Sequence, residues 1–545
     1  MNAQHIPADL DSIRTELARL KRDATTVSAT TINFIVFIDD AQRREWVMER
    51  ATMIGDKHPS RMIVLDTTGV EDGATVETFA GDGHSTIKSE RITLSCRGMN
   101  AEELRAIAHA LTIPDLVLNA FCRRDDSAAL EAARASGARW AAGEARPLDG
   151  VPVSIKDLVL MAGAPTLRGS RTVDPAQAWD EDAPATARLR EAGAVLIGKT
   201  TTPEFGCKAF TDSRLTGITR NPWSPAHTPG GSSGGAAAAV ASGMGPLAVG
   251  TDGGGSIRLP ASYCGLVGLK ASSGRVPAWP PSIHGSLAHV GPITRTLTDA
   301  ALMLSVLAQP DARDFWALAN APHHYASGLD DGVRGLRIGF APQLGGAHMD
   351  PAVAQAVAEA VAIFETLGAH VETVAAPFAD LGPVQAVLWC AGADLIVSAM
   401  SADMRALLDP VFAAQAAFGA QFTGHQVQDA HRRRAEAGYA MAAFHQRYDL
   451  LLTPTTPTTA PLVRAPGEMP EGVDDLNTMV PFTFPFNMTG QPAVSVPCGV
   501  VDGRPIGLQI VGPPRGDALV LRVARAFEAT QPVRRPDLGA LARRA

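Results

Sequence analysis

Short apolar runs alternate with alanine-rich stretches from residue 118 to the end of the chain, and this alternation constrains the fold most. Buried strands bounded by turn residues are predicted at GVPVSIKDL (150–158), GAVLIGKT (193–200), YDLLLTPT (448–455) and QPAVSVPCG (491–499). GGAAAAVASG (234–243) predicts a small-residue helix that packs closely, and residues 310–445 are mostly helical in pattern, as expected of an insertion or cap. This mixture predicts an α/β fold with a sheet covered by helices.

Residues 1–115 are predicted to form a separate, small α/β accessory unit. The apolar runs TINFIVFI (31–38) and SRMIVLD (60–66) predict two strands, and the segment between them predicts a helix that begins at Asp39 or Asp40. These three elements predict a βαβ unit. A further strand is expected at SERITLSC (89–96) and a further helix at MNAEELRAIAHAL (99–111).

Length and charge restrict the class of protein. A chain of 545 residues exceeds a typical single domain, so we predict two, at 1–115 and 116–545. A net charge of -8 argues against a nucleic-acid partner. The six cysteines and fourteen histidines show no metal-ligand spacing, so neither a metal nor a cofactor is expected. With no signal peptide and no membrane-length apolar run in the sequence, the expected location is the cytoplasm, away from any membrane.

The stretch GTDGGGSIRLPA (250–261) places Ser256 directly after three consecutive glycines. Peptide N–H groups without side chains can form a nest that binds an anion, and such donors stabilise a developing oxyanion. Ser256 is therefore a candidate nucleophile. Asp252 and Arg258 flank the turn, and an ion pair between them would fix its shape. The alternative is a tight loop with an ordinary serine.

Two further motifs carry candidate catalytic groups. In HTPGGSSGGAAAA (227–239), glycines on both sides of Ser232 and Ser233 let the backbone approach another group closely, although a loop that caps the following helix would look the same. In GVPVSIKDL, the alternation places Lys156 on one face of a strand with Ser154. Burial of a lysine lowers its pKa and can make it a general base. The alternative is an edge-strand lysine that points into water.

Of two formal motif matches, the first is weak and the second is rejected. Gly230 to Gly234 fits the nucleophile elbow G-x-S-x-G, but the preceding residues NPWSPAHTPG make a poor strand. GAVLIGKT fits the phosphate-binding pattern G-x-x-x-x-G-K-[ST], but its four central residues are the apolar core of a strand. The N–H groups of a strand are used in sheet pairing, so nucleotide binding is not expected.

Together, the motifs resemble the amidase signature family, in order and in spacing, over residues 118–545. The resemblance rests on GVPVSIKD, TPGGSSGGAAAAVASG, GTDGGGSIRLPA and CGLVGLKASSGRVP, and later on GPITRTLTDAALML, FTFPFNMTGQPAVSVPCG and PIGLQIVGPP. It implies a large mixed β-sheet with helices on both faces and hydrolysis of a small-molecule amide through an acyl-enzyme. By the family's motifs, Ser256 is the nucleophile, Ser232 the bridging serine after a cis bond from Gly231, and Lys156 the base. The resemblance further implies an oxyanion hole made by the backbone N–H groups of Gly253, Gly254, Gly255 and Ser256.

Residues 1–115 resemble part of the glucose-6-phosphate dehydrogenase assembly protein family, through HPSRMIVLD and ERITLSCRGMNAEELRAIAHALTIPDL. The junction lies in NAEELRAIAHALTIPDLVLNAF (100–121), which fits either unit. Two other functions stay open: the glutaminase subunit of a tRNA-dependent amidotransferase, and a non-catalytic assembly factor that acts through residues 1–115. A homodimer and a protein partner for the N-terminal unit stay open as well.

Overall fold

The computed structural model describes residues 32–38, 59–66, 73–82, 87–95, 115, 117–318, 324–346, 348–473, 475–532 and 534–538. The chain divides into two compact units, one of Met1–Val117 with Asp537–Ala545 and one of Leu118–Pro536.

The smaller unit contains a four-stranded sheet in the order β1-β2-β3-β4. The strands are β1 (Ile32–Ile38), β2 (Pro59–Asp66), β3 (Gly73–Asp82) and β4 (Ile87–Ser95). β1 and β2 are parallel, as a βαβ unit requires, and β3 pairs antiparallel with both β2 and β4. Three of these strands match the predicted ones, whereas β3 was not predicted. The helices expected after Asp39 and at 99–111 lie outside the described residues.

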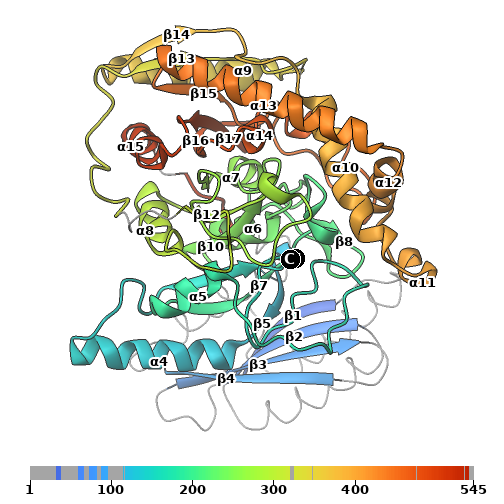
Figure 1. The fold of residues 1–545 in the computed structure, drawn as a ribbon. Coiled ribbons are helices and arrows are strands. Elements are labelled where there is room, and N and C mark those ends of the chain that lie inside the picture. Colours follow the sequence, from blue (N-terminus) through green and yellow to red (C-terminus); the bar gives the residue numbers. More distant parts are fainter. Residues whose placement is uncertain are drawn as a thin grey trace. The chain divides into compact units, whose positions relative to one another are not determined.

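An eleven-stranded mixed sheet forms the centre of the larger unit (Figure 1). Parallel pairs join β6 to β7 and β10, and β13 to β14 and β15, and the other pairs are antiparallel. In spatial order the strands are β14 (His370–Thr373), β13 (Arg337–Phe340), β15 (Leu450–Pro454), β17 (Arg504–Val511), β16 (Ala493–Val501), β11 (Val267–Lys270), β12 (His289–Thr294), β10 (Leu247–Asp252), β6 (Pro152–Lys156), β7 (Val195–Thr200) and β5 (Phe121–Arg124).

Helices cover both faces of this sheet, which confirms the predicted fold class. On one face, apolar side chains of four helices form a single core with the strands, and the rings of Phe364 and Phe527 stack at 5.3 Å. These helices are α5 (Pro184–Glu191), α8 (Leu297–Leu307), α9 (Pro351–Thr366) and α15 (Asp517–Glu528). The opposite face is covered by α6 (Gly234–Ala241), α7 (Arg258–Cys264), α13 (Gly424–Arg447) and α14 (Pro485–Met488).

The small-residue helix predicted at 234–243 is α6, and all eight of its residues are buried. Alanine and glycine let this helix lie directly against β10, because no larger side chain holds the two apart. α7 packs beside α6, so the loops that precede these two helices emerge together.

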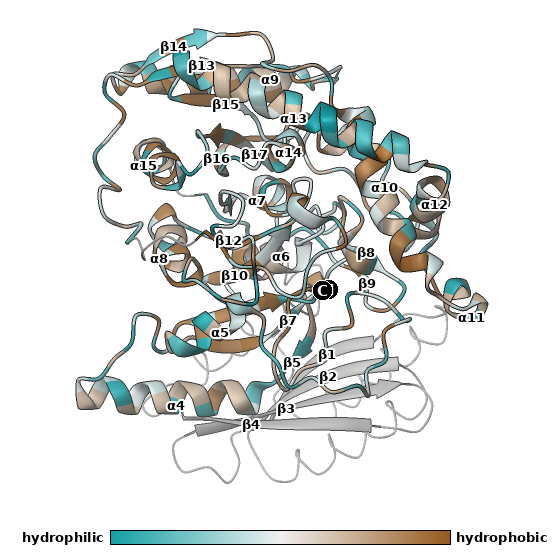
Figure 2. Ribbon diagram, in the orientation of Figure 1, coloured by the Kyte–Doolittle hydropathy of each residue, from teal (hydrophilic) through white to brown (hydrophobic). Residues whose placement is uncertain are grey.

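The expectation for residues 310–445 is correct only in part. The segment is mostly helical, with α10 (Gly382–Ser398), α12 (Pro410–Gly419) and α13, and Figure 2 shows that many residues of α13 are hydrophilic. It also supplies β13 and β14, which extend the main sheet rather than cap it. Each of these strands has only four residues, too few for a clear alternation in the sequence. No described helix is long and apolar enough to cross a membrane.

Candidate active site

The three predicted catalytic segments meet beside the ends of two neighbouring strands. β6 ends at Lys156 and β10 ends at Asp252, and these strands pair in parallel with Val249 opposite Ile155. Carboxyl ends of adjacent parallel strands share one edge of a sheet, so Lys156 lies next to the glycine-rich turn. Ser232 lies in the loop before α6, and the Ser233 N–H donates to the Ser256 carbonyl at 3.1 Å.

Lys156 is fully buried, which excludes the alternative of an edge-strand lysine in water. Its Nζ lies 2.7 Å from Ser232 Oγ, 2.9 Å from Ser233 Oγ and 2.8 Å from Thr251 Oγ1. All three partners are uncharged hydroxyl groups. Burial therefore places the pKa of Lys156 well below its usual value, and the negative charge of Asp252 opposes this only in part.

The loop that carries Ser232 is shaped by close contacts that only glycine permits. The Gly231–Ser232 peptide bond is cis. A Cβ on Gly231 would lie 2.6 Å from the backbone nitrogen of Phe210, so a side chain has no room there. A Cβ on Gly206, at the end of the short helix Glu204–Gly206, would lie 3.3 Å from Ser232 Oγ, so this second segment also packs closely against the serine.

In the glycine-rich turn, Ser256 is 8% exposed. Gly255 has a φ of +133°, a conformation that L-residues rarely adopt, and the Thr483 hydroxyl donates to the Gly254 carbonyl at 2.7 Å. Within the described part of the chain, the N–H groups of Gly253, Gly254 and Ser256 have no acceptor. The Gly255 N–H instead donates to Asp252 Oδ1 at 2.8 Å. The family resemblance had implied that this N–H belongs to the oxyanion hole.

A fully buried ion pair holds the turn, and Asp252 and Arg258 form it as predicted from their positions. Arg258 Nη2 and Nε donate to the two carboxylate oxygens at 2.8 and 2.9 Å. Burial alone would raise the pKa of Asp252, but the Arg258 guanidinium, the Asn487 amide and the charge of Lys270 together outweigh that effect and lower it. Arg258 also donates to the Thr483 carbonyl at 2.8 Å, to Gln509 Oε1 at 2.7 Å and to Asn487 Oδ1 at 2.7 Å.

A cavity of about 440 Å³ opens beside Ser256 and Gly254. Most of its wall is apolar, formed by Ala209, Ala386, Trp389, Val411, Ala414, Phe418, Met469 and Val480. Lys208 is the cation in this wall, and it is already paired with the carboxylates of Asp212 and Asp409. Asp475 is the acid in the wall, and its side chain caps the short helix that begins at Leu476.

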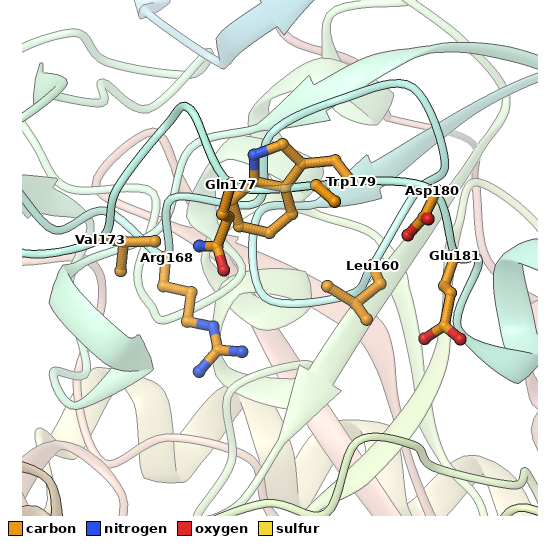
Figure 3. Close-up of a pocket in the computed structure, with 8 residues that line it drawn as sticks. Leu160, Arg168, Val173, Gln177, Trp179, Asp180 and Glu181 are labelled. Carbon is orange, nitrogen blue, oxygen red and sulfur yellow. The ribbon is translucent and has the colours of Figure 1, made fainter.

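A second cavity of about 370 Å³ lies elsewhere in the larger unit (Figure 3). It is lined by Leu160, Arg168, Val173, Gln177, Ala178, Trp179, Asp180 and Glu181. None of these residues belongs to the three motifs, and the lining holds no serine or cysteine nucleophile, so we do not assign it to the reaction. The part of the chain that the structure describes contains no cluster of histidine, cysteine and carboxylate groups able to hold a metal.

Sequence reasoning missed several polar groups near the site. Thr251 stands in the quoted motif GTDGGGS and Ser233 in GGSSGG, but nothing in the spacing showed that their hydroxyls contact Lys156. GAVLIGKT forms strand β7, so its rejection as a phosphate-binding loop is correct. Its lysine, Lys199, is fully buried within the fold.

Known protein families match both parts of the chain. The Amidase family model matches residues 102–521, and the model for the glucose-6-phosphate dehydrogenase subunit N-terminal domain matches residues 51–131. An acylamidase of Rhodococcus erythropolis is 38% identical over 427 residues, 76% of this chain and 88% of the relative. The glutamyl-tRNA(Gln) amidotransferase A subunit of Myxococcus xanthus is 39% identical, over 78% and 93% of the two chains. The crystal structure of a bacterial aryl acylamidase of the amidase signature family matches with a TM-score of 0.73 at 31% identity, over 81% and 94% of the two chains.

Proposed function

Because the chain belongs to the amidase signature family and is thus a hydrolase of carboxamide C–N bonds, we propose that Ser256 is its nucleophile, Ser232 its proton relay and Lys156 its general base. The observation that carries this proposal is the 2.7 Å contact between Lys156 Nζ and Ser232 Oγ. It lies at the carboxyl ends of β6 and β10, beside the glycine-rich turn that contains Ser256. A serine hydroxyl is a weak nucleophile and needs a base. A desolvated lysine with only hydroxyl partners can supply one at neutral pH.

The proposed acylation step moves one proton along two hydroxyls. Ser256 Oγ attacks the amide carbonyl carbon while its proton passes to Ser232 Oγ, and the proton of Ser232 passes to Lys156 Nζ. The tetrahedral intermediate then collapses, and the C–N bond breaks. The same groups return the proton to the leaving nitrogen, which departs as ammonia or an amine and leaves an ester on Ser256.

Deacylation repeats these steps with water in place of Ser256. Water attacks the ester carbonyl and gives its proton to Ser232, which again passes one to Lys156. The carboxylic acid leaves, Ser256 recovers its proton, and the site returns to its first state. No cofactor is needed, because every proton that is removed is later returned.

We assign the oxyanion hole to the N–H groups of Gly253, Gly254 and Ser256. Donors fixed toward the position of the developing negative charge stabilise the transition state without reorganisation. The N–H of Gly255 has a different role in this scheme, since it holds the turn through Asp252.

For the substrate, we propose an uncharged amide with an apolar aryl or alkyl portion. The cavity wall beside Ser256 is mostly apolar, and Trp389 and Phe418 provide aromatic surface. A substrate carboxylate would need a cation, and Lys208 is already neutralised by Asp212 and Asp409. The similarity to acylamidases is consistent with this choice.

A glutaminase subunit is the second candidate, since amidotransferase subunits are among the relatives. Glutamine carries a carboxylate and an ammonium group, and the described residues of the cavity wall offer no unpaired cation for the carboxylate. We therefore expect kcat/KM for neutral aryl or alkyl amides to exceed that for glutamine. ATP-dependent transamidation in the presence of partner subunits would favour the glutaminase instead.

Replacement of the proposed nucleophile tests the assignment directly. We expect Ser256→Ala to abolish amide hydrolysis and labelling by a fluorophosphonate probe, with the circular dichroism spectrum unchanged. Ser262→Ala is the matched control, because Ser262 is a buried serine of α7 outside the proposed site. Turnover in Ser256→Ala at the wild-type rate, or probe labelling of another residue, would refute the assignment.

The organisation of the chain, its partners and its location are proposals separate from the catalytic assignment. The division at 1–115 and 116–545, a protein partner for the first unit, a homodimer and a cytoplasmic location all stay predictions. Affinity capture with the full chain, followed by sedimentation of the purified protein, tests the partner and the dimer. A role as an assembly factor without catalysis would require that Ser256→Ala leave the cellular function intact.

A further inference from the structure

The hydrogen bonds around Lys156 can be counted, because each donor and acceptor has a fixed capacity. A neutral amine has two N–H groups and one lone pair, whereas an ammonium has three N–H groups and no acceptor. Three hydroxyl oxygens surround Nζ, those of Ser232, Ser233 and Thr251. In the neutral amine, two of these oxygens therefore accept a hydrogen bond, and the third hydroxyl donates to the lone pair.

Ser233 can only accept from Lys156. Its hydroxyl donates to the Thr251 carbonyl at 3.1 Å, and its oxygen also accepts from the Thr251 N–H at 3.3 Å. The single proton of the Ser233 hydroxyl is thus already used. One N–H of Lys156 is therefore directed at Ser233, and Ser232 and Thr251 share the other N–H and the lone pair.

The choice between Ser232 and Thr251 decides whether the site can react. If Thr251 donates to the lone pair, Ser232 accepts from Lys156 and its proton points away from the base. If Thr251 accepts, the lone pair faces the Ser232 proton, and Ser232 can take a proton from Ser256. Thr251 is half-buried, so in this second arrangement its own proton can go to water.

We propose that Thr251, with Ser233, is a positioning residue that occupies both N–H groups of neutral Lys156 and so aims its lone pair at Ser232. This inference rests on the proposed function. When Lys156 receives the proton, its third N–H turns to Ser232 and all three oxygens accept. The same three oxygens thus satisfy both protonation states without movement of the lysine nitrogen.

The test compares Thr251→Val, which keeps the shape of the side chain, with the wild type. Without the Thr251 oxygen, the neutral amine can turn its two N–H groups to Ser233 and Ser232, which is the unproductive arrangement. We expect kcat/KM to fall about tenfold, the effect of one hydrogen bond to a charged or reacting group. The ammonium loses an acceptor that it cannot replace, so the acid limb of the pH profile should move to lower pH.

The charged or ionisable groups that act on Lys156 are Asp252 at the end of β10 and Cys207 after the short helix Glu204–Gly206, and both are unchanged in the variant. Thr251→Ser restores the hydroxyl and should restore both kcat/KM and the acid limb. Thr166→Val is the matched control, because Thr166 Oγ1 lies 2.7 Å from Nζ of Lys199, another fully buried lysine. It should lower thermal stability without shifting the acid limb.

Wild-type kcat/KM in Thr251→Val, or an acid limb that does not move, would overturn the inference. Failure of Thr251→Ser to rescue would do the same, since it would show that shape rather than the hydroxyl matters. Failure of the proposed function is a different result, because it appears as turnover in Ser256→Ala whatever happens at Thr251.

Discussion

Two lysines lie on neighbouring strands of the same sheet, and they differ in the chemical groups that contact their side-chain nitrogens. Lys156 ends β6 and Lys199 lies on β7 opposite Ile155, and both are fully buried. Lys156 contacts three hydroxyls. Lys199 contacts the Val159 carbonyl at 2.6 Å, the Thr166 hydroxyl at 2.7 Å and the Asp157 carboxylate at 3.5 Å.

The difference lies in what these partners can do with a proton. A carbonyl and an ionised carboxylate only accept hydrogen bonds, so they favour a lysine that donates and is charged. Hydroxyl groups donate as well as accept, so they suit a neutral amine and an ammonium equally. Burial lowers the pKa of both lysines, but Asp157 opposes the shift at Lys199 from direct contact. The surroundings of Lys199 suit a structural ion pair, and those of Lys156 suit a base.

The same substitution at each lysine should separate the two roles. We expect Lys156→Met to lower kcat by about 10²–10⁴-fold, because general acid–base catalysis typically contributes that much. The measurement is steady-state turnover of a neutral aryl amide, with fluorophosphonate labelling of Ser256 as a second reading. Turnover close to that of the wild type would mean that the two lysines do not differ as proposed.

Lys199→Met should affect the fold instead. It leaves the buried Asp157 carboxylate without its lysine, and removal of one partner from a buried pair costs about 3–5 kcal/mol of stability. Urea unfolding should show this loss, while the protein that stays folded keeps most of its turnover. A catalytic defect as large as that of Lys156→Met, in protein of normal stability, would contradict the comparison.

The pH dependence of stability gives the finest distinction. The pKa of Lys156 in the folded protein lies well below its ordinary value of 10.5. Between those two pKa values the unfolded chain binds a proton that the folded chain lacks, so stability rises with pH, by at most about 1.4 kcal/mol per pH unit. As pH rises toward 10.5, the unfolding free energy of the wild type should therefore increase relative to that of Lys156→Met. Parallel curves would show that Lys156 is charged in the folded protein.

Much of the fold was predictable where an element carries a long or distinctive pattern. GVPVSIKDL and GAVLIGKT became β6 and β7 because their apolar residues are bounded by turns, and the alanine run became α6. The four-residue strands β13 and β14 were not recognised. β13 takes its place in the sheet by pairing with β15, which begins only at Leu450, and β14 in turn pairs with β13.

The site was predictable to the level of motifs but not of contacts. The motifs name Lys156, Ser232 and Ser256, whose roles stay proposals. The hydroxyl of Thr251 reaches Lys156 because β10 pairs with β6 in one register, and a sequence does not state a register. For the same reason, the partners of Lys199 could not be foreseen.

The bonds of Arg258 have a consequence for how the protein is made. Its acceptors on Thr483, Asn487 and Gln509 come 225, 229 and 251 residues later in the chain. A polypeptide still growing on the ribosome thus contains Lys156, Ser232 and Ser256 long before the acceptors that hold Arg258 and the glycine-rich turn are translated. We expect such a nascent chain to lack amidase activity until β17 has emerged. A protein truncated before β17 should therefore be inactive.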